Sequence, residues 1–389
     1  MSHLSSQPSQ GRTPLRTVQV LGGGSAGSSV HVRSLTGGLV ARGVRVTVCA
    51  PAELDERYGF TASGARFVPV PRRADPVSVA ALRAACAEAD LVHAHGLHAA
   101  VRSSLARTKP GKQGKPGTAP RTPLVVTWHT RAYAEGARAH LLRMIERRVA
   151  KASAVVLGTS SDLVDRARSR GARDARLAPI AFPAPRRPAA PGHDDPDRLK
   201  HQARAELGAV ERPLLLAVGS LEPHRGYGTL LDAARSWLSL DPVPLLVVAG
   251  EGPERGALQR RIDTEGLPVR LVGRREDVPE LLTAADVALL PSRWESRSVL
   301  AHEALHAGVP LVATAVGGVP ELVGDAAELV PYGDARALAT AVEGLLAQPG
   351  RRAWLRAEGL AQAATWPTED ETVAQILSVY DELTQPLGR

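Results

Sequence analysis

Cysteine, aromatic side chains and long apolar runs are scarce in this sequence. Only two cysteines, Cys49 and Cys86, occur among 389 residues, too few for a disulfide framework, and a reducing compartment is therefore expected. Aromatic residues make up 3% of the chain, which argues against the stacking platforms that bind single-stranded nucleic acid. No stretch approaches the roughly 18 apolar residues of a membrane span, and residues 1–16 lack the apolar core of a secretory signal. These absences predict a cytoplasmic protein.

Lysine is absent after Lys200. The second half of the chain therefore offers no lysine for a Schiff base, which disfavours a pyridoxal-dependent phosphorylase. The formal net charge is nevertheless +8, and a basic balance favours anionic partners such as sugar nucleotides or phospholipid surfaces. A general surface bias explains the charge equally well, because the positive residues are spread along the chain.

Apolar, β-branched runs alternate with helical patterns along the chain, which is typical of parallel sheets covered by helices on both faces. The expected strands form two groups: 17–21, 44–49, 65–70, 91–94, 124–128 and 154–157, then 214–218, 245–249, 269–272, 287–290, 311–313 and 328–330. Between the groups, prolines and charges at 183–200 predict a linker. We therefore expect an α/β protein with two Rossmann-like units, whose ligands bind at the carboxyl ends of the strands in the cleft between them.

Two acids bracket a predicted helix start in the second half. Glu295 precedes the helix and Glu303 lies two turns inside it, and eight helical residues rise about 12 Å. The first N–H groups of a helix lack internal partners, so those near Ser298, Val299 and Leu300 are suited to an anion. The arrangement fits a nucleotide-sugar, which has sugar hydroxyls at one end, ribose hydroxyls at the other and a diphosphate between them.

The segment 289–322 resembles the E-x7-E region of retaining GT-B glycosyltransferases, glycosyltransferase family 4. The likeness continues in order along the chain, from Val18 to about Leu383, through a glycine-rich first turn and the segments VHAHG, VVTWHT, VGSLEPHRG, AGEGP and VGRREDVPELLTAADV. The resemblance implies the GT-B fold, with two Rossmann-like domains facing across a cleft and a C-terminal helix that crosses back to the first domain. It also implies a retaining transfer of a sugar from a UDP- or GDP-sugar to an acceptor.

The domain limits expected from these patterns divide the chain into five segments. They are a disordered tail at 1–16, an acceptor domain at 17–182, a linker at 183–200, a donor domain at 201–365 and the crossing helix at 366–389.

The resemblance also assigns roles to individual residues. Glu295 is expected to touch the transferred sugar, Glu303 the ribose, His129 the sugar from the first domain, and Arg225 the diphosphate. The remaining expected substrate-binding residues are Gly23, Gly24, His95, Gly219, Ser220, Arg274, Ser298, Val299 and Leu300. Ser220 departs from the family, which usually has a second phosphate-binding arginine there; His224 or an arginine from elsewhere could compensate for the missing cation. No metal or other cofactor is expected if such cations neutralise the diphosphate.

Other interpretations compete with these assignments. Gly22, Gly24 and Gly27 form a G-x-G-x-x-G turn, but the next strand ends without the acid that a nicotinamide dinucleotide site needs. A sugar-nucleotide epimerase on the same scaffold stays open, since fold alone does not decide function. A non-catalytic sugar-nucleotide binder also stays open because of Ser220.

Two further patterns have both a functional and a structural interpretation. His93, His95 and His98 suggest a metal site, but no cysteine or acid completes the ligand set, so metal binding is disfavoured. The basic amphipathic helix at 138–151 has an apolar stripe that includes Leu141. Packing on its own sheet is the favoured interpretation, and peripheral contact with the inner face of a membrane is the alternative.

Overall fold

The computed structural model describes residues 13–23, 26–72, 75–107, 122–131, 136–183 and 196–385. Gly24, one of the expected substrate-binding residues, lies outside these ranges, as do residues 1–12 of the predicted tail and 184–195 of the predicted linker. Within the described ranges, no helix is both long and apolar enough to cross a membrane.

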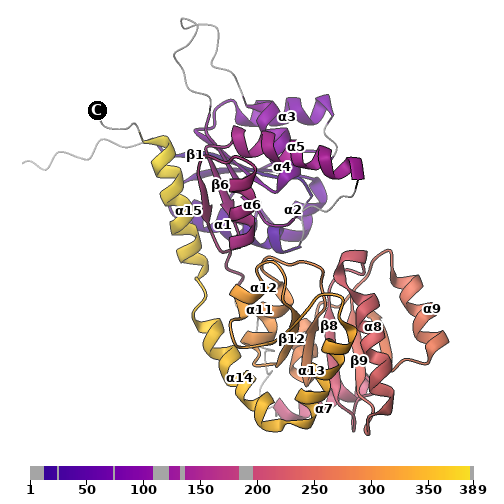
Figure 1. Cartoon of the computed structure of the whole chain (residues 1–389). Helices are drawn as coiled ribbons and strands as arrows, with labels where there is room; N and C mark the ends of the chain where they lie inside the picture. The colour runs from indigo at the N-terminus through magenta and orange to yellow at the C-terminus, as the bar shows by residue number, and fades with distance from the viewer. Residues whose placement is uncertain are drawn as a thin grey trace, which may run out of the picture.

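The chain forms two lobes, each built on one parallel sheet (Figure 1). The N-terminal sheet has seven strands in the order β3-β2-β1-β4-β5-β6-β7. Its strands are β1 (Arg16–Leu21), β2 (Arg45–Ala50), β3 (Arg66–Pro69), β4 (Leu91–His95), β5 (Leu124–Trp128), β6 (Val155–Gly158) and β7 (Ala175–Leu177). The C-terminal sheet has six strands in the order β10-β9-β8-β11-β12-β13. Its strands are β8 (Leu214–Val218), β9 (Leu245–Ala249), β10 (Val269–Gly273), β11 (Val287–Leu290), β12 (Leu311–Thr314) and β13 (Glu328–Val330).

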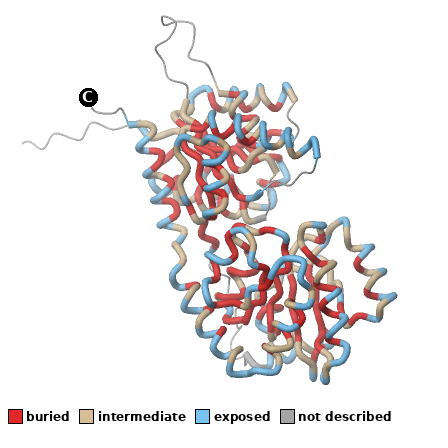
Figure 2. The backbone as a smooth tube through the Cα atoms, in the orientation of Figure 1, coloured by how far each residue is buried: buried red, intermediate tan, exposed pale blue. Residues whose placement is uncertain are grey.

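Helices cover both faces of each sheet, and the strands form the buried centre of each lobe (Figure 2). The N-terminal lobe contains α1 (Ala26–Ala41), α2 (Ala52–Tyr58), α3 (Pro76–Cys86), α4 (Leu97–Ala106), α5 (Gly136–Ala152) and α6 (Ser161–Ser169). The C-terminal lobe contains α7 (Pro196–Glu206), η1 (Pro223–Arg225), α8 (Tyr227–Ser236), η2 (Trp237–Ser239), α9 (Arg255–Glu265), α10 (Val278–Ala284), α11 (Val299–His306), α12 (Val319–Val323), α13 (Ala335–Ala347) and α14 (Pro349–Ala364).

All twelve predicted strands form, each within one residue of its expected ends. The prediction missed β7, a three-residue strand at the edge of the first sheet that is only partly buried and has no apolar run. The linker prediction was wrong at its end, because α7 begins at Pro196 and makes residues 196–200 helical. Proline in the first turn of a helix needs no internal hydrogen bond, so it favours a helix start there rather than a break.

The last helix, α15 (Glu369–Thr384), crosses back and packs along α1 of the N-terminal lobe, as the resemblance implies (Figure 1). Val373, Ile376, Val379 and Tyr380 belong to the buried core on one face of the first sheet. The helix begins three residues later than expected, where Thr368 and Glu371 form a capping box. Trp366 packs on the C-terminal lobe instead, where its indole N–H donates to the carbonyl of Leu322 at 3.0 Å.

The predicted basic helix forms as α5, and three members of its expected apolar stripe turn inward: Val149 is buried, and Leu142 and Ile145 are partly buried. The fourth, Leu141, was placed wrongly, because 57% of it is exposed. Glu146 is also buried, and its carboxylate pairs with Arg166 at 2.7 Å and with Arg170 at 2.8 Å, both on or next to α6. A buried carboxylate is tolerated when its oxygens are paired in this way.

Candidate active site

A cavity of about 270 Å³ lies where loops from the two lobes meet. Its lining comes from three loops: Thr130 and Arg131 after β5, His224 and Arg225 after β8, and Trp294 and Glu295 after β11. All three loops follow the carboxyl ends of parallel strands, which is where α/β sheets bind ligands. The predicted residues Arg225 and Glu295 therefore meet in one cavity, next to the loop that follows His129.

Gly226 brings Arg225 to this cavity. Its φ of +74° is in the left-handed region, and a β-carbon there would lie 1.9 Å from the carbonyl oxygen of Pro291. Only glycine permits such a close approach, so the loop after β8 can close onto the end of β11. A backbone hydrogen bond from Arg293 to His224, 2.8 Å long, holds the two loops together.

Arg225 forms an ion pair with Glu295 in this cavity. The hydroxyl of Ser292 donates to the same carboxylate oxygen at 3.1 Å. Burial raises the pKa of the Glu295 carboxyl, while the Arg225 guanidinium opposes that rise. The site thus contains a desolvated carboxylate whose charge depends on one cation.

The glycine pair at 317–318 supports the Glu295 loop from the C-terminal lobe. The amide of Gly318 donates to the carbonyl of Glu295 at 2.9 Å. A β-carbon on Gly317 would lie 2.1 Å from that carbonyl oxygen, and one on Gly318 would lie 2.5 Å from the carbonyl oxygen of Ser296. The Gly-Gly sequence is therefore needed for the loop to pack this closely.

Helix α11 begins as predicted. Ser298 is its N-cap, and its hydroxyl accepts from the amide of Ala301 at 3.3 Å. Val299 and Leu300 occupy the first two helical positions, whose amides have no partner within a helix. Gly27, at the start of α1, lies against Val299, since a β-carbon on Gly27 would be 3.7 Å from the valine methyl. The first turn of α11 therefore faces the N-terminal lobe.

Glu303 lies on α11, half-buried, and its carboxylate has no hydrogen bond or ion pair with any described residue. Burial raises the pKa of this carboxyl to about 7. A half-buried carboxyl without a protein partner is free to accept hydrogen bonds from a ligand. It does not line the 270 Å³ cavity that contains Glu295.

His129 is buried at the end of β5, and its Nε2 lies 3.2 Å from Nδ1 of His95. The other nitrogen of His95 lies 3.0 Å from the side-chain oxygen of Gln19. Both ring nitrogens of His95 are therefore occupied, which argues against the predicted direct contact between His95 and substrate. His93 and His95 share a strand face as expected, but the described residues include no group of three or more His, Cys, Asp or Glu side chains placed to hold a metal ion.

Gly23, Gly219 and Arg274, which were expected to bind substrate, have different surroundings. Gly23 adopts a φ of +94°, with the Arg72 guanidinium 3.3 Å from where its β-carbon would be. Gly219 allows the hydroxyl of Tyr227 to approach, 3.1 Å from the corresponding position. Arg274 is exposed, pairs with Glu276 at 3.2 Å and does not line the cavity.

Comparison with known proteins identifies the family. Residues 26–183 match the model described as "Glycosyl transferase 4-like domain", and residues 200–361 match "Glycosyl transferases group 1". A D-inositol 3-phosphate glycosyltransferase from Salinispora arenicola is 32% identical over a region that covers 77% of this chain and 70% of that protein. The chain belongs to glycosyltransferase family 4.

Other relatives agree with this assignment. An α-D-kanosaminyltransferase from Streptomyces kanamyceticus is 29% identical over 67% of this chain and 71% of its own length. The crystal structure of Anabaena HepE in complex with UDP and glucose superposes with a TM-score of 0.76 over 94% of this chain and 99% of that one, at 18% identity. The transferase therefore has the GT-B fold.

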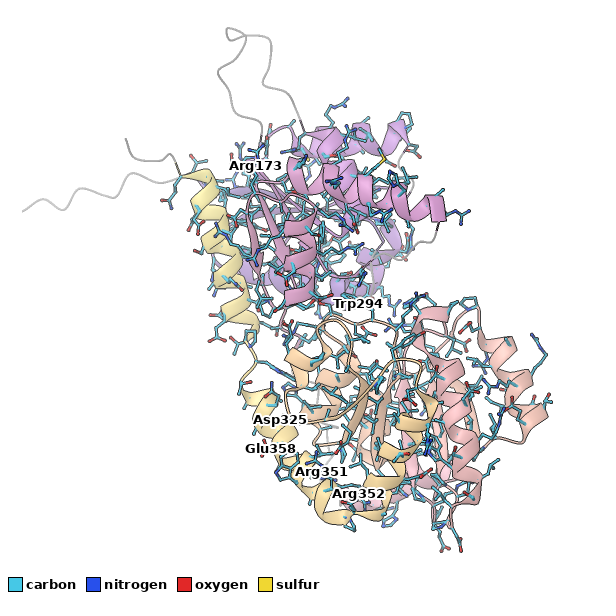
Figure 3. All side chains as sticks on the ribbon, viewed as in Figure 1. Arg173, Trp294, Asp325, Arg351, Arg352 and Glu358 are labelled. Atoms are coloured by element: carbon cyan, nitrogen blue, oxygen red, sulfur yellow. The ribbon has the colours of Figure 1, made fainter. Side chains whose placement is uncertain are left out.

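Several residues around the cavity of this transferase were not predicted from the sequence. Trp294 packs into the core of the N-terminal lobe and donates to Asp162 at 2.9 Å, and Figure 3 shows it where the lobes meet. Ser296 lies 2.6 Å from the hydroxyl of Thr159. Both neighbours of Glu295, Trp294 and Ser296, thus contact the N-terminal lobe. The available signal in the sequence was that residues 159–162 directly follow the carboxyl end of a strand.

A second arginine also lines the cavity of the transferase. Arg131 lines it from the N-terminal lobe, whereas Arg225 comes from the C-terminal lobe. Its position two residues after His129 was the available signal in the sequence. His224 also lines the cavity, with its Nδ1 3.3 Å from Glu222.

Proposed function

We propose that this glycosyltransferase moves a sugar from a UDP- or GDP-sugar to an acceptor hydroxyl with retention of anomeric configuration. The observation that carries the proposal is the pairing of Arg225 and Glu295 in a cavity that both lobes line. Among similar proteins, Anabaena HepE has been crystallised with UDP-glucose, and a Mycolicibacterium smegmatis mannosyltransferase is named GDP-mannose-dependent. Both support a nucleoside diphosphate sugar as donor.

Arg225 and the first turn of α11 hold the diphosphate in this proposal. A guanidinium can donate to two phosphate oxygens at once and stabilises the charge that develops on the leaving nucleotide. The amides of Val299 and Leu300 add donors at the positive end of the helix dipole. Arg131 adds positive charge from the other lobe, so the site needs no metal ion.

Glu295 and Glu303 hold the two ends of the donor. Once the diphosphate engages Arg225, the Glu295 carboxylate is free to accept from hydroxyls of the transferred sugar. Glu303 accepts from the ribose hydroxyls. His129 contacts the sugar from the opposite lobe, which makes the site complete only when both lobes contribute.

Retention follows from a front-face route in this proposal. The leaving phosphate accepts the proton of the acceptor hydroxyl, so the enzyme needs no nucleophile. Glu295 is the one carboxylate among the residues that line the cavity, and Arg225 neutralises it, which fits a positioning role better than nucleophilic attack. A double-displacement glycosidase-type site would need a second carboxyl about 5 Å away.

A donor screen followed by a transfer assay tests the proposal. Bound donor raises the melting temperature by mass action, so UDP-, GDP-, ADP- and TDP-sugars are compared with and without EDTA. The acceptor panel starts from compounds named in similar proteins, D-inositol 3-phosphate and 2-deoxystreptamine. Stabilisation by a nucleotide-sugar and an α-linked product from an α-linked donor are expected.

The alternatives predict different products from the same assay. A changed sugar still attached to its nucleotide, formed without acceptor, would indicate an epimerase. An inverted linkage would contradict retention, and stabilisation that requires a divalent metal would contradict the metal-free site. The transferase names of the relatives disfavour both the epimerase and the non-catalytic binder.

A further inference from the structure

A chain of buried polar side chains connects the C-terminal helix to His129. The hydroxyl of Tyr380 on α15 lies 3.0 Å from the side-chain nitrogen of Gln19 on β1. The side-chain oxygen of Gln19 lies 3.0 Å from Nε2 of His95, and Nδ1 of His95 lies 3.2 Å from Nε2 of His129. We call Tyr380, Gln19, His95 and His129 the buried chain. The buried chain connects α15, which follows the C-terminal lobe in sequence, to the side of the N-terminal lobe that faces the cleft.

The donor and acceptor roles along the buried chain follow from one amide. The oxygen of Gln19 can only accept, so Nε2 of His95 carries the proton. Burial lowers the pKa of both His95 and His129 well below the usual value, so both rings are neutral. A neutral His95 with a proton on Nε2 has a lone pair on Nδ1, and His129 must donate from its Nε2 to that lone pair.

Tyr380 holds the amide of Gln19 in this orientation through a second branch. His93 lies 2.6 Å from the Tyr380 hydroxyl through Nδ1 and 2.7 Å from the hydroxyl of Thr127 through Nε2. When Tyr380 donates to Nδ1 of His93, its oxygen is left to accept from the nitrogen of Gln19. Rotating the Gln19 side-chain amide by 180° would exchange the donor and the acceptor in every hydrogen bond of both branches.

The remaining nitrogen of His129 has no partner among the described residues. Its Nδ1 is buried and makes no hydrogen bond to any of them. With the proton on Nε2, Nδ1 carries a lone pair, and a buried acceptor without a partner costs free energy until a donor arrives. His31 lies beside it, with ring centres 5.5 Å apart, and burial lowers the pKa of His31 to about 4, so the neighbour is neutral too.

We propose that Tyr380 is a positioning residue that acts through Gln19 and His95 to hold His129 in the Nε2–H tautomer, so that its Nδ1 accepts a hydrogen bond from a hydroxyl of the bound sugar. The sugar contact rests on the proposed function, whereas the tautomer is a property of the ligand-free protein. In this proposal α15 has two roles: it contributes to the core of the first lobe, and it determines that Nδ1 of His129 is a hydrogen-bond acceptor.

The tautomers can be measured without donor or acceptor. Two-bond ¹H–¹⁵N correlation spectra of the full chain labelled with ¹⁵N-histidine distinguish Nδ1–H from Nε2–H rings. His95 and His129 are assigned by substituting each in turn, and both are expected to carry the proton on Nε2. A proton on Nδ1 of His129 would overturn the proposal, whether or not the protein transfers sugar.

Variants test whether Tyr380 sets the tautomer. Tyr380→Phe removes the hydroxyl, and we expect the single tautomer of His95 and of His129 to become a mixture. Tyr58→Phe makes the same chemical change on α2, at a tyrosine that has no hydrogen bond with Gln19, His95 or His129, and should leave both rings unchanged. Should Tyr380→Phe fold poorly, Gln19→Leu gives the same loss by removing the acceptor for Nε2 of His95.

Kinetics then separate positioning from folding. Loss of one aligned hydrogen bond predicts a fall in kcat of roughly three- to tenfold in Tyr380→Phe, with little change in the donor KM. The melting curve of each variant is recorded beside its rate. An unchanged tautomer in a folded Tyr380→Phe protein would show that the hydroxyl does not control His129 and would refute the inference, even if transfer itself were confirmed.

Discussion

Arg225 and Glu295 are bound to each other in the cavity, although each is assigned to a different part of the donor. The pairing keeps a half-buried carboxylate and a half-buried guanidinium compensated before any ligand arrives. A diphosphate carries more negative charge than the carboxylate and can replace it as the partner of Arg225. Donor binding would then release Glu295 towards the sugar at the moment when the sugar enters.

Removing Arg225 should therefore affect both the donor and Glu295. Arg225→Ala is expected to lower kcat/KM by about 100- to 1000-fold, because a cation aimed at developing charge is lost. The variant should also bind donor more weakly in thermal-shift titrations. Arg168→Ala, which removes an exposed arginine on α6, serves as the control and should behave as wild type. A wild-type rate in Arg225→Ala would eliminate it as the diphosphate ligand.

Glu303 should make donor affinity depend on pH. Its pKa is raised to about 7 by burial, and only the ionised carboxylate accepts from both ribose hydroxyls. Donor affinity is therefore expected to rise about tenfold between roughly pH 6 and pH 8, as the ionised fraction grows. Isothermal titration in buffers of different ionisation enthalpy should also detect proton release on binding near pH 7.

Glu303→Gln provides the matched control for this pH dependence. The amide cannot titrate, so the rise in affinity between pH 6 and pH 8 should flatten, leaving any contribution of Glu295. Since the folded pKa is above the unfolded one, the ionised form costs stability as the pH rises from about 4.5 through about 7. Glu303→Gln should therefore melt at a higher temperature than wild type at pH 8. A variant that keeps the full wild-type pH profile would rule out this role.

The alternation of apolar runs was sufficient to predict every described strand except β7, because parallel strands buried on both faces must be apolar along their length. The helix start between Glu295 and Glu303 could be predicted as well, since Ser298 is a residue type that caps helices. Contacts between the lobes could not be predicted from the sequence. Nothing in the sequence around Asp162 indicates that its carboxylate meets Trp294, 132 residues further along the chain. The surroundings of His95 were hidden for the same reason, because Gln19 and Tyr380 come from distant elements.

The contact between Trp294 and Asp162 should link lobe closure to the Glu295 loop. Trp294→Phe keeps the apolar ring in the core of the N-terminal lobe but removes the 2.9 Å hydrogen bond. We expect kcat to fall by about three- to tenfold and the ratio of donor hydrolysis to transfer to rise, since a looser closure admits water. Product analysis by mass spectrometry gives both quantities.

Trp354→Phe is the control for this change. Trp354 lies on α14 and is 41% exposed, stacked against Arg351 rather than against the other lobe; Figure 3 labels Arg351 on the far side of the C-terminal lobe from Trp294. Its substitution should leave the hydrolysis ratio unchanged. If the ratio of donor hydrolysis to transfer were the same in both variants and in wild type, the contact between Trp294 and Asp162 would have no role in lobe closure.

The exposed side chains of α5 allow the alternative interpretation of this helix, contact with an anionic membrane, to be tested. Leu141 and Met144 are each 57% exposed, and Arg143, Arg147 and Arg148 lie beside them on the same helix. Exposed apolar side chains among arginines suit an interface with anionic lipids. The double variant Leu141→Gln, Met144→Gln is expected to bind vesicles containing phosphatidylglycerol about tenfold more weakly in a sedimentation assay. Added salt should weaken binding of the wild type, because the arginine contribution is screened.

Leu360→Gln, on α14 and 48% exposed, controls for the loss of an exposed leucine elsewhere. Vesicle binding that is absent in wild type, or equal in all three proteins, would restrict α5 to its packing role against Arg166 and the first sheet.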